Sequence, residues 1–520
     1  PNLGYRDVQQ ILALTARKVN DPNTDTTYNG ATNWNGGGMH TSHDYGFGDV
    51  DARAAVRLAE SWVSTRASYN ERHLGSGEGS LSGVNGSAAN LGIAINDGAV
   101  ITRTLNIGAG LRAEHATVSL DITHSNWGDL TVELISPTGT ISKLIANPGT
   151  SATNPGGDVG TGQLTFALDT THDYGENAQG NWQLRITDRS GLGTGTLNGW
   201  KVDVYGSDLN ETNPGLDTAG STPLISATGN NQYFYTDEFA TAPGASRATL
   251  TDSNGGGDIL NATAVSTGST INLNNGTTST IAGRGLTING DVEHAFGGDG
   301  NDMITGNALS NRLSGGRGND TLSGGDSMDL LDGGQGNDTL TGGAGNDYFV
   351  IGKAANSVDT ITDFSPGTVG EKILLVGFDN VTDYSQIVVT QEGANTRLNL
   401  GDGQSVLLQN IAPTGISEQN FGFFSDTTTL EKFAKYTSNP TIWSGDSGVQ
   451  NTLLPGSYGD LLAFALGGDD VVGGRTTNDL IDGGDGNVLG SDSQTMQGAR
   501  GYMDGCLPRA ANDRFVRCAA

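Results

Sequence analysis

The residues of this sequence best suited to chemistry are aspartates that recur within a glycine-rich array. From Gly297 a nine-residue period runs through six units, which read GGDGNDMIT, GNALSNRLS, GGRGNDTLS, GGDSMDLLD, GGQGNDTLT and GGAGNDYFV. Their eighth positions are all large and apolar: Ile304, Leu313, Leu322, Leu331, Leu340 and Phe349. The glycines permit tight turns in which carbonyl oxygens converge, and the sixth-position carboxylate is a hard ligand that suits Ca²⁺. Six units in register do not arise from composition alone.

The array resembles the calcium-binding nonapeptide of RTX proteins, Gly-Gly-x-Gly-x-Asp-x-U-x, in which U is a large apolar residue. The resemblance implies a parallel β-roll with two units per coil, so units 297, 315 and 333 share one side and units 306, 324 and 342 share the other. On the second side Asn311 replaces Asp, Leu309 lies in a turn without its glycine, and Ser327 interrupts another unit. We therefore expect a well-formed ion site in each gap of the first side and fewer, weaker sites on the second. The expected metal-binding residues are Gly298, Gly300, Asp302, Gly316, Gly318, Asp320, Asp329, Gly334, Gly336, Asp338, Gly343, Gly345 and Asp347.

Charge supports a cation as the partner. The chain has 27 Lys and Arg against 57 Asp and Glu, a net charge of −30, which opposes binding to nucleic acid or an anionic membrane. Residues 291–350 contain nine Asp, one Glu and two Arg, so the local balance is 2 − 10 = −8. Without cations these carboxylates repel one another, and we expect metal binding and folding to be one event. A plain Gly/Asp-rich linker is the alternative, but a linker needs no apolar period.

Residues 90–206 show the alternation of β-strands, as in 117–122 and 130–135. The series Asp121-Ile122-Thr123-His124, Gly128-Asp129-Leu130, Gly175-Glu176-Asn177, Gly180-Asn181-Trp182 and Gly199-Trp200 resembles the P domain of kexin-like convertases. The resemblance implies a jelly roll that packs on its own catalytic domain. We expect Trp182 and Trp200 in its core. Asp121, Asp129 and Glu176 are read as ordinary surface carboxylates, with cation binding as the alternative.

The first 70 residues predict two amphipathic helices. Val8, Ile11, Leu12 and Val19 are expected on the buried face of the first helix, and Val56, Ala59, Trp62 and Val63 on that of the second. The segments 5–12 (YRDVQQIL) and 42–52 (SHDYGFGDVDA) resemble the end of a subtilisin/kexin-like serine protease domain. The resemblance implies a short helical remnant whose catalytic Asp, His and Ser lie upstream of Pro1, so the chain is expected to begin at a cut.

Several motifs imitate catalytic sites. The segment 149–152 (GTSA) with Pro155 partly matches a subtilase nucleophile motif, but no apolar helix follows Ser151. The segment 445–448 (GDSG) has no matching His motif and is read as a turn. No His-Glu-x-x-His spacing occurs among the seven His, and His43 beside Asp44 is read as part of a loop.

The ends of the chain have their own signatures. Residues 348–375 resemble the cap that follows RTX rolls in serralysin-type proteases, whereas the tract around 467–487 fits a second array and a turn-rich stretch equally well. Arg-rich residues 498–520 hold Cys506 and Cys518, the only cysteines, and are expected to be a foreign or frameshifted end that lacks any native secretion signal. No apolar run approaches the roughly 18 residues of a membrane span.

Together these observations predict a mainly β protein with a P-domain jelly-roll sandwich, an RTX parallel β-roll and a short helical remnant of a subtilase domain. The expected domains are the remnant (1–70), the P domain (90–206), a linker (207–260), the roll and its cap (261–425), a second degenerate RTX tract (426–497) and an aberrant tail (498–520). The expected function is the Ca²⁺-binding C-terminal region of a secreted bacterial serine endopeptidase, exported by a type I-like route, in a chain that itself lacks the triad. The alternative is a calcium-dependent extracellular adhesion or structural module.

Overall fold

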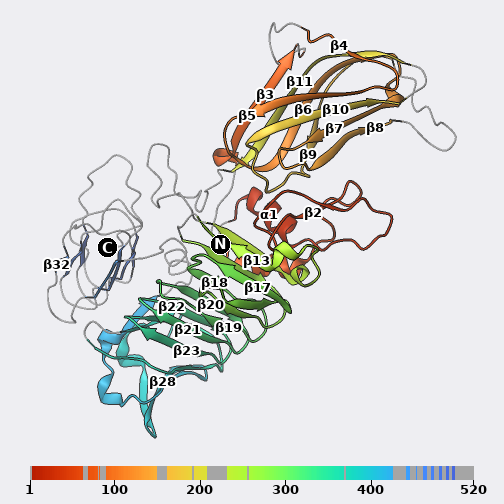
Figure 1. Ribbon diagram of the computed structural model, residues 1–520. Helices are drawn as coiled ribbons and strands as arrows, with labels where there is room; N and C mark the ends of the chain where they lie inside the picture. The colour runs from red at the N-terminus through yellow and green to blue at the C-terminus, as the bar shows by residue number, and fades with distance from the viewer. Residues whose placement is uncertain are drawn as a thin grey trace. The chain divides into compact units, whose positions relative to one another are not determined.

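The structure, a computed structural model, describes residues 3–62, 68–79, 81, 90–148, 161–189, 193–207, 231–253, 257–367 and 371–424, with seven short strands between 441 and 497 (Figure 1). The chain divides into two compact units. One consists of Asn2–Ala52 and Thr65–Pro214, and the other of Arg53–Ser64 and Gly215–Ala520. The first is called the sandwich unit below, and the second the roll unit.

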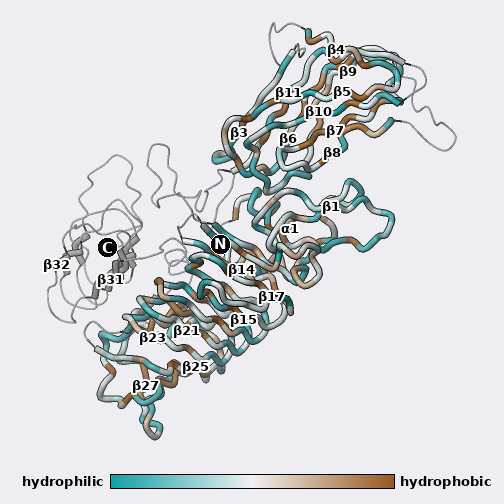
Figure 2. Tube along the Cα trace, viewed as in Figure 1, coloured by the Kyte–Doolittle hydropathy of each residue, from teal (hydrophilic) through white to brown (hydrophobic). Residues whose placement is uncertain are grey.

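Two antiparallel sheets make up most of the sandwich unit. One has the strand order β5-β10-β7-β8, and the other β3-β11-β6-β9 with β4 paired to β11. The bounds are β3 Arg72–Gly79, β4 Ile93–Ile95, β5 Val100–Ile107, β6 Arg112–His124, β7 Leu130–Ile135, β8 Ile141–Ala146, β9 Gly162–Thr170, β10 Gly180–Asp188 and β11 Gly195–Ser207. Alternate residues of these strands fill the core, where Trp182 and Trp200 are both 0% exposed. Figure 2 shows the apolar segments along the strands. The predicted sandwich and its two core tryptophans are therefore confirmed.

The first helix, α1 (Tyr5–Thr15), belongs to the sandwich unit and buries only part of the predicted face. Ile11 and Leu14 are buried, whereas Val8 is 43% exposed and Leu12 is 37% exposed. The reason is polar: the guanidinium of Arg6 is buried and donates to the Glu114 carboxylate from Nε at 2.8 Å and from Nη2 at 2.7 Å. A buried ion pair thus fixes which side of the helix faces inward. The same unit holds a small hairpin, β1 (Thr27–Tyr28) and β2 (His40–Thr41).

The roll unit is built mainly from parallel strands in two sheets, with strand orders β12-β14-β18-β20-β22-β24-β26-β30 and β13-β17-β16-β15-β19-β21-β23-β25-β29-β28-β27. The first sheet is entirely parallel: β12 Gln232–Thr236, β14 Ile259–Ala264, β18 His294–Phe296, β20 Arg312–Arg317, β22 Leu330–Gln335, β24 Tyr348–Gly352, β26 Lys372–Val376 and β30 Phe421–Phe424. The second sheet comprises β13 Thr249–Thr251, β15 Thr270–Asn272, β16 Thr278–Ile281, β17 Arg284–Asn289, β19 Met303–Thr305, β21 Thr321–Asp326, β23 Thr339–Ala344, β25 Val358–Ile361, β27 Val388–Glu392, β28 Asn395–Gly401 and β29 Gln404–Leu408.

Strand register confirms that two nine-residue units make one coil. Ile304 pairs with Leu322 and Leu322 with Leu340 in one sheet, while Leu313 pairs with Leu331 in the other. All six eighth-position side chains are 0% exposed and belong to one apolar core. The period of the sequence therefore corresponds to a column of stacked apolar residues between the two sheets.

The roll unit begins earlier in the chain than expected. Residues 231–253, within the range expected to be a linker, include β12, which pairs with β14, and β13, which pairs with β17. The second helix, α2 (Ala52–Glu60), also lies in this unit apart from its first residue, although it was expected to belong with the rest of the N-terminal segment. Its buried residues are Ala54, Ala55 and Leu58, while Val56 is 55% exposed, so the prediction was wrong for Val56. Trp62, which follows the helix, is buried as predicted. Val63 lies outside the described residues.

Beyond residue 424 the described strands form two further parallel sheets. Their orders are β31-β33-β35-β37 and β32-β34-β36, with bounds β31 Thr441–Ser444, β32 Thr452–Leu453, β33 Leu461–Phe464, β34 Asp470–Val472, β35 Leu480–Asp482, β36 Val488–Gly490 and β37 Thr495–Gln497. The parallel pairing is like that of the first sheet of the roll unit, and a second array in this tract stays a prediction. The tail 498–520, with both cysteines, lies outside the described residues.

Three carboxylates of the sandwich unit are not on the surface as predicted. Asp121, Asp129 and Glu176 are only 2%, 7% and 1% exposed. Glu176 accepts hydrogen bonds from the backbone N–H of Gly30 and from the Ser136 hydroxyl. Asp121 accepts two from the Gln163 amide. Protein donors that are distant in sequence compensate the burial of Asp121 and Glu176, and a local sequence pattern does not reveal such donors.

Asp173 is an exception, because it is 1% exposed and neither carboxyl oxygen has a hydrogen-bond partner. Burial, reinforced by the Glu176 carboxylate, raises the pKa of Asp173 well above the usual range of an aspartate, to about 8. The folded unit therefore holds this group as the neutral acid at pH 7. The unfolded chain ionises it, so folding must take up a proton.

We predict that Asp173→Asn stabilises the sandwich unit at neutral pH. A raised native pKa gives stability that is complete below the unfolded pKa near 4 and is lost as pH rises towards about 8. Relative to the natural chain, the variant should gain little at pH 4 and up to about 4 kcal/mol at pH 7. Denaturant unfolding followed by tryptophan fluorescence measures this, because Trp34, Trp182 and Trp200 are buried in this unit. If the free energies of unfolding of the two proteins changed with pH in parallel, the prediction would be contradicted.

Candidate metal centre

The turns that join the two sheets of the roll place the repeated aspartates in columns. On one edge the backbone N–H of Asp302 donates to Oδ1 of Asp320 at 2.7 Å, and that of Asp320 donates to Oδ1 of Asp338 at 2.8 Å. The N–H of Asp338 continues the series to Oδ1 of Asp359 at 3.1 Å. We call these four residues the first ladder.

The opposite edge carries a second ladder of Asn311, Asp329 and Asp347. The N–H of Asn311 donates to Oδ1 of Asp329 at 2.7 Å, and the N–H of Asp329 donates to Oδ1 of Asp347 at 2.9 Å. Asn311 differs because its side chain is fully engaged: Nδ2 donates to the carbonyl of Glu293 at 2.8 Å and Oδ1 accepts from the N–H of Asn307 at 2.7 Å. The amide therefore completes this turn without an added cation.

In each ladder the second carboxylate oxygen is left over. Oδ2 of Asp320, Asp329, Asp338 and Asp347 is buried and has no hydrogen-bond partner, and the four residues are at most 2% exposed. An ionised carboxylate oxygen buried without a donor is costly, and a bound cation removes that cost. These oxygens are the strongest structural indication of a ligand in the roll.

The pKa values of the ladder carboxyls agree with this picture. Burial raises the pKa of Asp320 and Asp329 to about 8, and neighbouring ladder carboxylates contribute in both cases. Burial raises the pKa of Asp302, Asp338 and Asp347 to about 6. The ladders without metal therefore favour taking up positive charge, either as protons or as cations.

The turn glycines allow backbone oxygens to approach the carboxylates. A Cβ at Gly315 would lie 2.3 Å from Oδ2 of Asp320 and 2.6 Å from the carbonyl oxygen of Gly333. Gly318 has φ +130°, and a Cβ there would lie 2.0 Å from the carbonyl oxygen of Gly300. Of the predicted glycines, all but Gly298 have a positive φ: Gly300, Gly316, Gly318, Gly334, Gly336, Gly343 and Gly345. Only residues without a side chain fit these positions.

The donor set is therefore carboxylate plus backbone oxygen. Among the described residues, no group of three His, Cys, Asp or Glu side chains is arranged to hold a metal ion. A ladder supplies one carboxylate per coil, so carbonyl oxygens must complete any coordination. Hard oxygen donors in flexible number suit Ca²⁺ better than they suit softer metals. The residues present fit a calcium ion.

Two acidic residues beside the predicted array were missed. Asp359 extends the first ladder but lies 21 residues after Asp338, because extra residues interrupt the 18-residue spacing. Glu293 lies 18 residues before Asn311 and accepts the N–H of Asp258 at 2.8 Å through Oε2. Extending the period backward by one unit would have found Glu293. The insertion before Asp359 concealed that residue.

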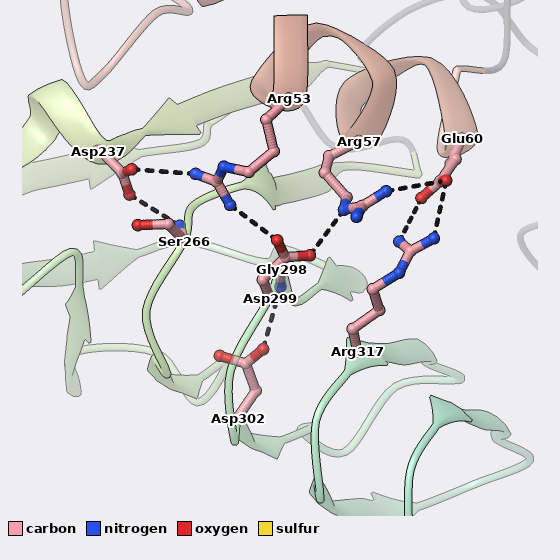
Figure 3. A network of polar contacts seen from close by, with 9 residues as sticks. All are labelled: Arg53, Arg57, Glu60, Asp237, Ser266, Gly298, Asp299, Asp302 and Arg317. Carbon is pink, nitrogen blue, oxygen red and sulfur yellow. Dashed lines mark hydrogen bonds and ion pairs between the residues drawn. The ribbon is translucent and has the colours of Figure 1, made fainter. Parts of the chain in front are cut away.

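Helix α2 contacts the first repeat through a network of charges (Figure 3). Arg53 donates to Oδ2 of Asp299 and Arg57 to Oδ1, both at 2.7 Å, and Glu60 pairs with Arg317 at 2.7 Å. Burial alone would raise the pKa of Asp299, but the hydrogen bonds from the two guanidiniums hold it below its usual range. Asp299 lies three residues before Asp302, so the helix anchors the turn that begins the first ladder.

The residues that imitate catalytic sites give no catalytic arrangement within the described part of the chain. His43 pairs with Asp25 rather than Asp44, with Nδ1 2.6 Å from Oδ2 of Asp25. Its Nε2 accepts the backbone N–H of Lys143 at 2.8 Å, so neither ring nitrogen is available to a nucleophile. The segments 149–152 and 445–448 lie outside the described residues. Within the part of the chain that is described, none of the helices has the length and apolar character needed to span a bilayer.

Comparison with known families identifies two parts of the chain. Residues 113–204 match the proprotein convertase P-domain, and residues 296–327 and 323–356 match the RTX calcium-binding nonapeptide repeat. The chain therefore carries a P domain and calcium-binding RTX repeats. Such repeats are typical of secreted bacterial proteins.

The relatives are subtilisin/kexin-like proteases. The chain is 30% identical over 216 residues to proprotein convertase subtilisin/kexin type 6 of Rattus norvegicus, covering 39% of this chain and 21% of that protein. It is 28% identical over 208 residues to furin of Homo sapiens, covering 40% and 24%. The chain thus spans about a quarter or less of these two curated relatives. Among solved structures, the serine protease of Aeromonas sobria shares 24% identity over 40% of this chain and 41% of that chain, with a TM-score of 0.30.

We predict that Arg53→Ala combined with Arg57→Ala destabilises the roll unit, because it leaves the partly buried Asp299 carboxylate without its two donors. These groups are partly exposed, so the expected loss is about 1 kcal/mol in the free energy of unfolding. Thermal unfolding monitored by β-sheet circular dichroism measures it. Lys353→Ala is the matched control, since it removes a cation of this unit that pairs with the exposed Asp379. Equal effects of the two changes would refute the anchoring role of α2.

Proposed function

We propose that this chain is the calcium-binding C-terminal region of a secreted bacterial serine endopeptidase, exported by a type I-like route. The P domain and the RTX repeats in one chain support the proposal, because the P-domain relatives are subtilisin/kexin-like proteases. Proteolysis would be the activity of the parent protein. In this proposal the catalytic Asp, His and Ser lie outside the chain, and residues 1–70 are the end of the catalytic domain.

The domain assignment follows from the same proposal. The P domain occupies 90–206 and packs against its own catalytic domain. The RTX roll and its cap occupy 261–425, a degenerate RTX tract 426–497 and an aberrant tail 498–520. We now place the start of the roll unit near residue 231 rather than after a linker that ends at 260, because β12 and β13 already pair with its strands.

One observation carries the calcium assignment to particular residues: the buried Oδ2 atoms of Asp320, Asp329, Asp338 and Asp347 have no donor, and they lie beside turn glycines. Oδ2 of Asp302 accepts the N–H of Gly298, and Asp302 is assigned through its place in the same ladder. We propose that Asp302, Asp320 and Asp338 with Gly298, Gly300, Gly316, Gly318, Gly334 and Gly336 form the stronger sites. Asp329 and Asp347 with Gly343 and Gly345 would form the weaker ones, because Asn311 closes the end of that ladder with its own hydrogen bonds. Bound Ca²⁺ would supply the positive charge that the stacked carboxylates need.

The consequence for the parent protein is that the roll folds only outside the cell. Where calcium is scarce, repulsion within the ladders opposes winding of the roll and keeps the segment open for export. Where calcium is plentiful, each ion that is present at about 100 times its dissociation constant stabilises the folded form by about 2.7 kcal/mol. Folding and metal binding then reinforce each other.

A calcium-dependent adhesion or structural module is the second candidate, because the RTX roll alone does not require an attached protease. The P-domain match at 113–204 favours the protease. An adhesin would not need a domain whose relatives accompany a catalytic domain.

We predict that calcium induces the β structure of the roll. Far-UV circular dichroism of the chelator-treated full chain should gain β signal when Ca²⁺ is titrated, because the ladders cannot stack while uncompensated. Asp320→Asn should weaken calcium binding more than Asp329→Asn, since Asp320 lies between two aspartates of its ladder. Asp326→Asn, an exposed carboxylate of the same array, is the control and should change little. A chelated chain with full β signal would argue against coupled folding.

We also predict that the chain has no peptidase activity of its own. The test is hydrolysis of a casein or peptide substrate by the full chain, together with Ser151→Ala, which removes the hydroxyl of the partial nucleophile motif. Both proteins should be inactive, because the triad is proposed to lie elsewhere. Hydrolysis that disappears in the variant would overturn this part of the proposal.

A further inference from the structure

A second acidic site lies before the repeats, beside the end of β13 and the start of β14; Figure 1 labels β13. Asp252 directly follows β13 in one sheet, and Asp258 directly precedes β14 in the other. The two aspartates thus lie next to strand ends that belong to different sheets of the roll unit. Neither residue belongs to the six units or to the matched repeat segments 296–327 and 323–356.

Asp258 has the same structural feature as the ladder aspartates. It is 0% exposed, its Oδ1 accepts the backbone N–H of Asn231 at 2.6 Å, and its Oδ2 has no hydrogen-bond partner. Its own N–H donates to Oε2 of Glu293 at 2.8 Å, as Asp329 donates to the next residue of its ladder. The unpartnered oxygen is therefore an independent sign of a missing positive charge.

Asp252 brings a second carboxylate to the same place. It is 6% exposed, and its Oδ1 accepts the Tyr233 hydroxyl at 3.2 Å and the Asn231 amide at 3.4 Å. Burial raises the pKa of Asp258 to about 8, and the nearby carboxyl group of Asp252 adds to that shift. Among the described residues, no Lys or Arg forms an ion pair with either aspartate. Two buried carboxylates therefore meet with no protein cation between them.

We infer that Asp252 and Asp258 bind a divalent cation of the Ca²⁺ class, at a site that precedes the six repeat units. The donors are hard oxygens, which excludes a preference for soft metals. Tyr233 and Asn231 orient the Asp252 carboxylate, while the N–H of Asn231 orients Asp258. Because Asn231 directly precedes β12, an ion here would hold the ends of β12, β13 and β14 together before the repeats.

The inference is tested on the full chain with the double variant Asp252→Asn, Asp258→Asn. Equilibrium dialysis should find one calcium ion fewer per chain than in the natural protein. In chelator the variant should melt at a higher temperature than the natural protein, because the amides remove the repulsion between the two carboxylates. The rise in melting temperature that Ca²⁺ produces should be smaller in the variant. Asp291→Asn removes a nearby exposed carboxylate and should keep the natural stoichiometry. An unchanged ion count and an unchanged calcium-induced gain would overturn the site in favour of a shared proton.

A second measurement covers the case in which the double variant does not fold. Tb³⁺ replaces Ca²⁺ and emits when a nearby tyrosine is excited, and the Tyr233 hydroxyl already lies 3.2 Å from Asp252 Oδ1. Tyr233→Phe should remove a defined part of the Tb³⁺ emission that Ca²⁺ competes away. Equal emission from both proteins would overturn the inference. Asp320→Asn should leave the Tyr233-dependent part intact, so failure of the ladder assignment and failure of this site give different results.

Discussion

Buried carboxylates stacked one coil above the next set the conditions for the whole roll. Each ladder aspartate uses one oxygen to accept the backbone N–H of the preceding coil, and this contact fixes the spacing of the coils. In Asp320, Asp329, Asp338 and Asp347 the second oxygen is buried in a turn where no donor meets it. A structure wound in this way is incomplete without positive charge, which calcium ions supply in our proposal.

The apolar core explains why the coils stack in one register. The eighth-position side chains form a single column between the sheets, and each coil contributes two of them. Two apolar residues per coil bury little surface, so the core specifies the register but provides limited stability. The turns must then contribute the rest, and glycine is required there because carbonyl oxygens of the adjacent coil occupy the space of a side chain. Stability and metal binding thus depend on the same short segments.

Buried acidic groups outside the ladders are compensated in different ways. At the start of the array, Arg53 and Arg57 of α2 neutralise Asp299, so protein cations act where the first coil has no earlier repeat to pair with. Further out, Asp252 and Asp258 meet without such a cation. In the sandwich unit Arg6 neutralises Glu114, while Asp173 stays unpaired and protonated. The chain therefore uses guanidinium, proton and, in our proposals, calcium as three ways to accommodate a buried acid.

The sequence by itself determined the roll, because a fixed period of Gly, Asp and an apolar residue has one way to wind, and the alternation of residues 90–206 likewise required a sandwich. It also identified the ladder aspartates from 302 to 347, since each is set by local spacing. It did not determine which faces of α1 and α2 are buried, that α2 joins the roll unit, or that Asp252 meets Asp258. Those outcomes depend on partners far away in the chain, such as Glu114 for Arg6 and Asp299 for Arg57. Only the tertiary structure decided them, because a charged side chain is buried where its partner lies. The periodicity of the sequence does not indicate which residue that partner is.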